Sequence, residues 1–172
     1  MGAKRDESFW VLRAQAGDRE ALELMFEALA PVLKRYLARI APSHADDLLQ
    51  DVLVIVYRKL GYLRDPELLR PWAFRIASRE ALRLLRKERG RGHADDPALV
   101  DRLAAEPDSH PDIALDAEGI LDAVPPASRA AMVLHYLHEL SFVDVASILE
   151  IPIGTVKSRI NYGLGLLRRA KA

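Results

Sequence analysis

The stretch that decides the fold is Ser141-Phe-Val-Asp-Val-Ala-Ser-Ile-Leu-Glu-Ile-Pro-Ile-Gly-Thr-Val-Lys-Ser-Arg-Ile160. Ser141, with Asp144 three residues later, resembles a capping box, which opens a helix. Pro152 prevents that helix from simply continuing. The apolar positions after Pro152 recur at helical spacing, so a second helix is expected from Ile153 or Gly154.

The two helices are spaced so that they pack against each other. Ala146 is small where the helices must approach closely, and Val156 lies ten residues later on the inward face of the second helix. This spacing is typical of a helix-turn-helix, whose second helix enters the major groove of DNA. An ordinary helical hairpin with a solvated polar face is the alternative. The polar residues expected to face solvent or DNA are Thr155, Lys157, Ser158, Arg159 and Asn161.

One residue fits the turn poorly. Glu150 occupies the place where a glycine often relieves a positive φ angle. We expect it to cost about 1 kcal/mol there or to impose a different turn.

The rest of the chain is also helical in pattern, because alanine, leucine, arginine and glutamate dominate and no alternating strand pattern persists. The sequence therefore predicts an all-α protein. In the first part of the chain, one helix is expected from about Asp18, with a kink or junction at Pro31, a second from the N-cap Ser43 to about Leu60, and a third from Trp72 to about Arg89. In the last part, a short helix is expected before Val124-Pro125-Pro126, followed by a helix from Ser128 to about Glu139.

The charges divide this chain of zero net charge into three parts. Residues 1–92 hold 18 basic and 13 acidic residues, residues 93–118 hold one basic and eight acidic, and residues 119–172 hold six basic and four acidic. The middle part also has three prolines and no long apolar period, which is typical of a linker. We therefore expect two small helical domains, 1–92 and 118–172, joined by a flexible acidic linker, 93–117.

Composition excludes several classes of protein. The chain has no cysteine, so it has no disulfide framework or thiol nucleophile. No stretch approaches the roughly 18 uninterrupted apolar residues of a membrane span, and the first ten residues are charged rather than apolar. No membrane insertion and a cytoplasmic location are the expectations.

A second basic feature lies in the first domain. Arg75, Arg79, Arg83 and Arg86 are spaced by four, four and three residues, so they form one ridge of a helix, which Lys87, Arg89 and Arg91 extend. Guanidinium groups in a row suit phosphates, although pairing with neighbouring glutamates is the alternative. The expected packing face is Trp72, Ile76, Leu82 and Leu85, and the nearby aromatics, either core residues or platforms for unpaired bases, are Tyr57, Tyr62, Trp72 and Phe74.

Taken together, these segments resemble the extracytoplasmic-function (ECF) sigma factors of bacterial RNA polymerase. The family's polymerase-binding pattern is matched by Asp47-Leu-Leu-Gln50-Asp51, and its Trp-x-x-x-Ile-Ala segment by Trp72-Ala-Phe-Arg-Ile76-Ala77. The Pro-rich opening of its second domain is matched by Val124-Pro125-Pro126, and its helix-turn-helix motif by Gly154-Thr-Val-Lys-Ser-Arg159. The order and separation of these motifs make the joint resemblance specific.

The resemblance implies a set of partners and contacts. The first domain would bind the clamp helices of the largest subunit of core RNA polymerase and the melted promoter element, while the second would sit on the polymerase flap and read the distal element of promoter DNA. An anti-sigma factor is a further implied partner, and neither enzymatic activity nor a cofactor is implied. The implied polymerase contacts are Asp47, Leu48, Gln50, Asp51 and Val54; those to the melted element are Trp72, Arg75, Arg79, Arg83 and Arg86; those to the distal element are Thr155, Lys157, Ser158, Arg159 and Asn161.

The chain departs from the family pattern at three places. Arg79 stands where an asparagine is frequent, and Leu53 where a phenylalanine is frequent. The segment Tyr162-Gly163-Leu164 replaces a basic continuation, so we expect fewer phosphate contacts there. Gly163 and Gly165 are each expected to weaken the helix by roughly 1 kcal/mol.

Three rival functions remain at the level of sequence. One is a sigma-like decoy that occupies an anti-sigma factor, and another is a stand-alone helix-turn-helix regulator, which leaves the Asp47–Asp51 motif unexplained. An enzyme or metal protein is the third, because His135 and His138 lie three apart on a helix. No third ligand follows at a fitting spacing, so no metal site is expected.

Overall fold

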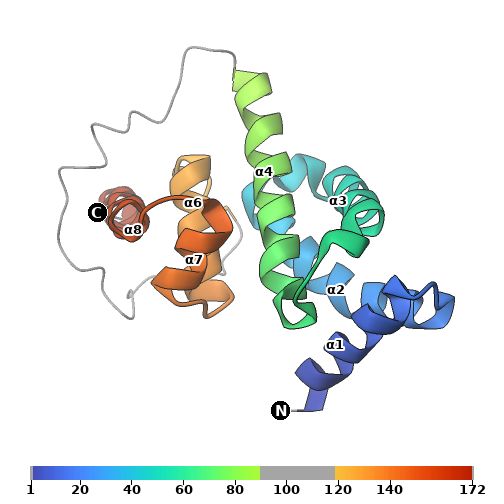
Figure 1. Ribbon diagram of the computed structural model, residues 1–172. Coiled ribbons are helices and arrows are strands. Elements are labelled where there is room, and N and C mark those ends of the chain that lie inside the picture. Colours follow the sequence, from blue (N-terminus) through green and yellow to red (C-terminus); the bar gives the residue numbers. More distant parts are fainter. Residues whose placement is uncertain (1, 90–118, 172) are drawn as a thin grey trace. The chain divides into compact units, whose positions relative to one another are not determined.

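The computed structural model describes residues 2–89 and 119–171, and every regular element within them is helical (Figure 1). The all-α prediction is therefore confirmed. The chain divides into two compact units, Met1–Ala81 and Leu82–Ala172, and the division falls inside a continuous helix. The expected linker 93–117, together with Arg91, lies outside the described residues, and the expected domain boundaries stay predictions. None of the helices described combines the length and the apolar character that a membrane crossing needs.

The first unit contains three α-helices and the first part of a fourth, which continues past the unit's limit at Ala81. They are α1 (Gly2–Gln15), α2 (Arg19–Ile40), α3 (Ala45–Lys59) and α4 (Leu69–Arg89), with short 3-10 turns before and after α3 and before α4. Helix α2 begins at the N-cap Asp18, as the sequence predicts, and runs unbroken through Pro31. The backbone amide of Ala21 donates to the Asp18 carboxylate, which is the main reason that the pKa of Asp18 is lowered.

Two expected helix starts are wrong for the same reason, a proline. Pro42 opens a 3-10 turn over Pro42–His44, so the N-cap of α3 is His44 rather than Ser43. Pro71 does not separate α4 from what precedes it but lies within its first turn, since α4 begins at Leu69. A proline is tolerated there because the first amides of a helix have no intrahelical acceptor.

The core of the first unit centres on Tyr36 of α2. Its ring is fully buried and meets the Phe74 ring of α4 edge-on, with centroids 5.3 Å apart and 80° between the planes. The Ser78 hydroxyl donates to the carbonyl of Phe74, so the Tyr36 hydroxyl donates to Ser78 across 2.7 Å. Burial raises the pKa of Tyr36, so its hydroxyl is neutral at physiological pH.

Helix α1 is tied to the rest of the unit by polar contacts. The buried carboxylate of Glu7 accepts from Arg70 at the start of α4, with Nε 2.9 Å from Oε2, and this bond raises the pKa of Arg70. The side-chain amide of Gln15 donates to the carbonyls of Leu60 and Leu63, both across 2.8 Å. Both contacts hold the connection between α3 and α4.

The second unit contains α6 (Pro126–Met132), a π-helical segment η4 (Val133–Leu137), α7 (Phe142–Leu149) and α8 (Ile153–Lys171). Helix α6 begins two residues before the expected Ser128, because Pro126 at the first position is already preorganised for a helix. A short helix was expected before Val124, but residues 119–123 form turns. The residues before 119 lie outside the part of the chain that the structure describes.

A buried arginine organises the turn that leads into α6. Arg129 is 6% exposed, and its guanidinium donates to the carbonyl of Val124 through Nε and one terminal nitrogen, and to the carbonyl of Asp122. Leaving a buried carbonyl without a hydrogen bond is costly, so these bonds hold the turn that contains Asp122 and Val124 against α6.

Gly163 of α8 is a contact point with α6, which sequence reasoning missed. A Cβ atom built on Gly163 would lie 2.2 Å from Sδ of Met132 and 3.2 Å from Cγ1 of Val124. Both side chains are buried, so neither can move without repacking. Gly163 therefore allows α8 to approach α6 closely, whereas a Cβ atom on Gly165 would meet nothing within 4 Å.

The two glycines should respond to alanine with opposite signs. We expect Gly163→Ala to lower the free energy of unfolding by about 1 kcal/mol, because overpacking costs ~1–3 kcal/mol and outweighs the helix propensity gained. Gly165→Ala should raise it by up to about 1 kcal/mol. Urea unfolding of the full chain followed by circular dichroism measures both, and stabilisation by Gly163→Ala would contradict the close contact.

Candidate functional site

The helix-turn-helix forms as expected from Ser141 onward. The Ser141 hydroxyl accepts from the Asp144 backbone amide across 3.1 Å, and the Asp144 carboxylate accepts from the Ser141 amide, so both halves of the capping box are present. Glu150 ends α7 with φ 56° and ψ 46°, the left-handed conformation that the sequence analysis considered costly. Helix α8 begins at Ile153, so the expected start is confirmed.

The inward face of the helix pair is only partly as predicted, since Val156 is buried but Ala146, expected at the close approach of the helices, is half-buried. Val145 and Ile148 of α7 and Val156 and Ile160 of α8 are all buried. The inward face of α8 continues through Leu164 and Leu167, beyond the motif. A single apolar row thus seats the whole of α8 on its unit.

The polar residues of α8 differ in exposure. Thr155, Lys157, Arg159 and Asn161 are half-buried, whereas Ser158 is 7% exposed. The expectation that Ser158 faces solvent is therefore wrong in this structure. Its hydroxyl donates to the carbonyl of Gly154 across 2.9 Å, because a short serine side chain reaches back to its own helix backbone.

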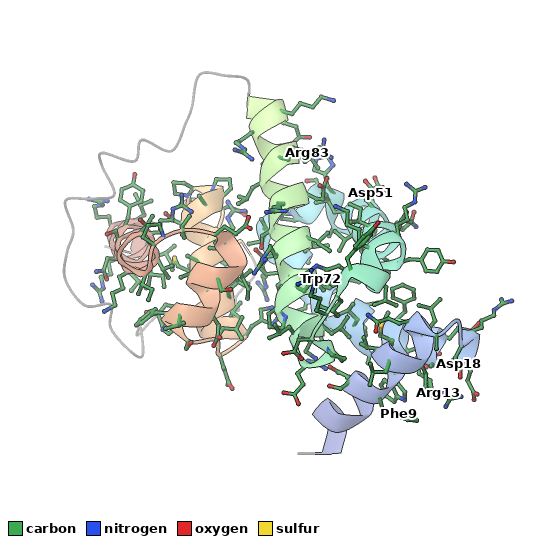
Figure 2. All side chains as sticks on the ribbon, in the orientation of Figure 1. Phe9, Arg13, Asp18, Asp51, Trp72 and Arg83 are labelled. Carbon is green, nitrogen blue, oxygen red and sulfur yellow. The ribbon has the colours of Figure 1, made fainter. Side chains whose placement is uncertain are left out.

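The arginine ridge lies on α4. Arg79, Arg83 and Arg86 are exposed, and the Nε atom of Arg86 donates to the Leu82 carbonyl one turn earlier. Arg75 is half-buried. Trp72, which begins the ridge, is half-buried and lies near the start of α4 (Figure 2). Four spaced arginines on one helix create a positive surface suited to a nucleic-acid backbone.

The packing face of α4 is only partly as expected. Ile76 is buried, but Trp72, Leu82 and Leu85 are half-buried. The residues that fill the inner face are small apart from Phe74, and they are Ala73, Phe74, Ala77, Ser78 and Ala81. Of these, only Phe74 was named as a possible core residue, because a hydrophobic period gives more weight to large side chains than to alanine or serine.

Helix α3 presents one fully exposed face. Asp47, Gln50, Asp51 and Val54 lie on this face, and Asp51 points outward in Figure 2. Leu48 does not share it, since it is 5% exposed and packs into the core, and its expected contact with a partner stays a prediction. Throughout, "the α3 face" means Asp47, Gln50, Asp51, Val54, Tyr57 and Arg58.

Two members of the α3 face, Tyr57 and Arg58, were not predicted as part of it. They follow Val54 by three and four residues, so they continue the same helix surface. Val54 is 48% and Tyr57 60% exposed, which makes an apolar area with Asp51 one turn before it and Arg58 at its other end. Helical spacing counted from Asp47 would have found both residues. An apolar patch with a polar rim is typical of a protein-binding surface.

Other candidate sites receive no support from the residues described. No group of three or more histidine, cysteine, aspartate or glutamate side chains suited to a metal occurs among them. His135 instead bonds through Nδ1 to the carbonyl of Leu140 and stacks on Phe142. Of the aromatic residues near the arginine ridge in the sequence, Phe74 lies in the core, while Tyr57 and Tyr62 are exposed.

Comparisons with known proteins fit this arrangement. The Sigma-70 region 2 family model matches residues 25–91, and the Sigma-70 region 4 model matches residues 115–165. The chain is 31% identical over 186 residues to the ECF RNA polymerase sigma factor RpoE of Cereibacter sphaeroides, covering 98% of each chain. It is 27% identical over 177 residues to the ECF RNA polymerase sigma-E factor of Escherichia coli K12, covering 93% of this chain and 91% of that factor.

Solved structures share the fold. One is CnrH in complex with the cytosolic domain of CnrY, with a TM-score of 0.65 and 20% identity, covering 96% of this chain and 97% of that one. Another is the sigma factor RpoE in complex with the anti-sigma factor NepR from Bartonella quintana, with a TM-score of 0.64 and 23% identity, covering 86% and 94%.

A region 2 unit followed by a region 4 helix-turn-helix unit defines the sigma-70 class of transcription factors. The chain belongs to the ECF family of RNA polymerase sigma factors. It directs transcription initiation, as a protein that binds core RNA polymerase and promoter DNA. The match to region 2 removes the stand-alone regulator, which has no use for such a unit.

Proposed function

We propose that the α3 face binds the clamp helices of the largest subunit of core RNA polymerase. The observation that carries this proposal is the exposure of Val54 and Tyr57 on the same face as the carboxylates of Asp47 and Asp51, which precede them along α3. Apolar area supplies affinity when it leaves water, and the flanking charges favour a basic partner surface. Leu48 supports the face from beneath.

The α4 ridge and α8 would contact promoter DNA. Arg79, Arg83 and Arg86 would neutralise phosphates around the melted element, with Trp72 and Arg75 at the inner end of the ridge. The second unit would sit on the polymerase flap and read the distal element. The α8 residues assigned to it are Thr155, Lys157, Arg159 and Asn161, with Ser158 keeping its bond to the helix backbone.

The chain would open promoter DNA by binding the melted form more tightly than the duplex, without a chemical step or a cofactor. Unstacking and unpairing bases costs a few kcal/mol per step, and capture of the separated strand offsets that cost. The domain limits proposed for this division are 1–92 and 118–172, with the acidic linker 93–117 between them.

An anti-sigma factor is a further proposed partner. Support comes from the two similar solved structures, one of the sigma factor RpoE in complex with the anti-sigma factor NepR and one of CnrH in complex with the cytosolic domain of CnrY. A cytoplasmic site of action follows from the proposed partners, which are core polymerase and DNA.

Run-off transcription tests these roles. The full chain is combined with core polymerase on a library of promoter fragments, and the selected fragments are compared with scrambled ones. Lys157→Ala is expected to lower selection of the distal element by roughly 5- to 150-fold, the range for one base contact, and to leave core binding intact. Arg169→Ala, an exposed cation near the end of α8, is the matched control and should not change promoter choice.

Two outcomes would contradict these roles. If Lys157→Ala weakened binding equally on selected and scrambled fragments, Lys157 would contact phosphate rather than base. If the wild type initiated on no fragment yet bound an anti-sigma factor tightly, the decoy would be favoured.

A further inference from the structure

Two side chains of the second unit, those of His135 and Lys157, contact the aromatic ring of Phe142. The imidazole of His135 stacks on the ring of Phe142, with centroids 4.3 Å apart and 27° between the planes. The Nζ atom of Lys157 lies over the same ring, 5.5 Å from its centroid. His135 belongs to η4, Phe142 opens α7 and Lys157 lies in the second turn of α8. The ring therefore connects all three elements.

The position of Phe142 is fixed by its neighbours in the chain. Its predecessor Ser141 is held by the capping box with Asp144. The carbonyl of Leu140 can only accept, so Nδ1 of His135 carries the proton and donates to it across 2.8 Å. The backbone amide of Leu140 also donates to the carbonyl of Leu134. The aromatic ring is thus held by its own helix start and by the stacked imidazole.

A fixed ring matters because a lysine side chain is long and flexible. An ammonium over an aromatic face is attracted to it, which restricts the positions that the side chain samples. Lys157 lies in the part of α8 where a helix-turn-helix reads base edges, and a lysine there can donate to the O6 and N7 atoms of guanine. Recognition of one base requires a defined ammonium position, whereas attraction to phosphate does not.

We propose that Phe142, held by His135, is a positioning residue that aims the Lys157 ammonium at a guanine edge in the distal promoter element. This inference rests on the proposed function of α8 and adds how Lys157 distinguishes bases. Phe142 itself touches no DNA in this account. It acts on specificity, and the charge that Lys157 contributes to overall affinity does not depend on it.

Two substitutions separate the aromatic face from simple packing. Phe142→Leu keeps an apolar side chain and removes the π face. If the leucine variant does not fold, Phe142→Met is used in its place. Phe142→Tyr keeps the aromatic face at this half-buried position. Thermal unfolding of each full chain verifies that it is folded before DNA is added.

The experiment uses the full chain with core polymerase on a duplex selected by the wild type. Affinity for this duplex is divided by affinity for the same duplex with each distal guanine replaced in turn. We expect Phe142→Leu to lower this ratio about two- to fivefold at the guanine read by Lys157, and Phe142→Tyr to keep it within about twofold. The slope of affinity against salt should not change, because Lys157 keeps its charge.

A double-mutant comparison identifies the route. In a Lys157→Ala chain, Phe142→Leu should cause no further fall in the ratio, because the side chain that it positions is gone. Additive falls, or equal weakening on every duplex, would overturn the inference. If Lys157→Ala lowers the ratio and Phe142→Leu does not, only this inference is wrong. If Lys157→Ala leaves the ratio unchanged, the proposed function of α8 fails with it.

Discussion

Asp51→Arg is expected to weaken binding of the chain to core RNA polymerase by ~30- to 1000-fold, which corresponds to ~2–4 kcal/mol for a central interface residue. Asp51 is exposed on the α3 face beside the apolar area of Val54 and Tyr57. Reversing its charge there removes attraction to a basic partner surface and adds repulsion. Fluorescence anisotropy of the labelled chain, titrated with core polymerase at fixed salt, measures the change.

A matched control separates charge from position. Glu27 is an exposed carboxylate on α2, outside the α3 face, so Glu27→Arg makes the same change elsewhere on the unit. Glu27→Arg should change affinity less than about threefold, because Glu27 is an exposed residue of another helix and is not part of the α3 face. Equal losses from the two variants would mean that net charge, and not the α3 face, governs polymerase binding.

Tyr36→Ala is expected to lower the free energy of unfolding by ~3–5 kcal/mol, the usual cost of removing a large aromatic side chain from a core. The ring is fully buried against Phe74, and its hydroxyl donates to Ser78. Urea unfolding followed by circular dichroism measures the loss. Tyr62→Ala is the control, since Tyr62 is 82% exposed, and it should change the value by less than about 0.5 kcal/mol.

The same hydroxyl gives a pH dependence with a defined sign. Because burial raises the pKa of Tyr36 in the folded chain, the neutral form is favoured there, and folding loses stability once the unfolded chain ionises above about pH 10. The loss should approach about 1.4 kcal/mol per pH unit from this group. Tyr36→Phe should remove that part of the alkaline slope, and an unchanged slope would show that another group causes it.

The sequence predicted the helix-turn-helix well because its signals are local. A capping box, a proline and an apolar period each act within a few residues, so Ser141, Pro152 and Val156 sufficed to place α7 and α8. The start of α3 was wrong because Pro42 and Ser43 both signal a helix start, and which one acts depends on the 3-10 turn that the proline opens.

What the sequence could not supply was contact between distant segments. Gly163 was expected to weaken α8, yet the side chains of Met132 and Val124 occupy the space that a Cβ atom at this position would need. Nothing in the local sequence pattern singles out Arg129, which donates to the carbonyls of Asp122 and Val124. For the candidate site, the family resemblance singled out Asp47 and Asp51, which lie on an exposed face, whereas Leu48 lies beneath it because adjacent residues point about 100° apart.

Gln15 shows how a residue near the surface can be as restricted as one in the core. Its single amide nitrogen serves two carbonyl oxygens at once, those of Leu60 and Leu63. Glutamate would set a carboxylate against both oxygens, asparagine is one carbon shorter, and lysine would bring an ammonium in place of a planar amide. The geometry of a loop more than 40 residues away in the chain therefore restricts which side chains could make both bonds from position 15.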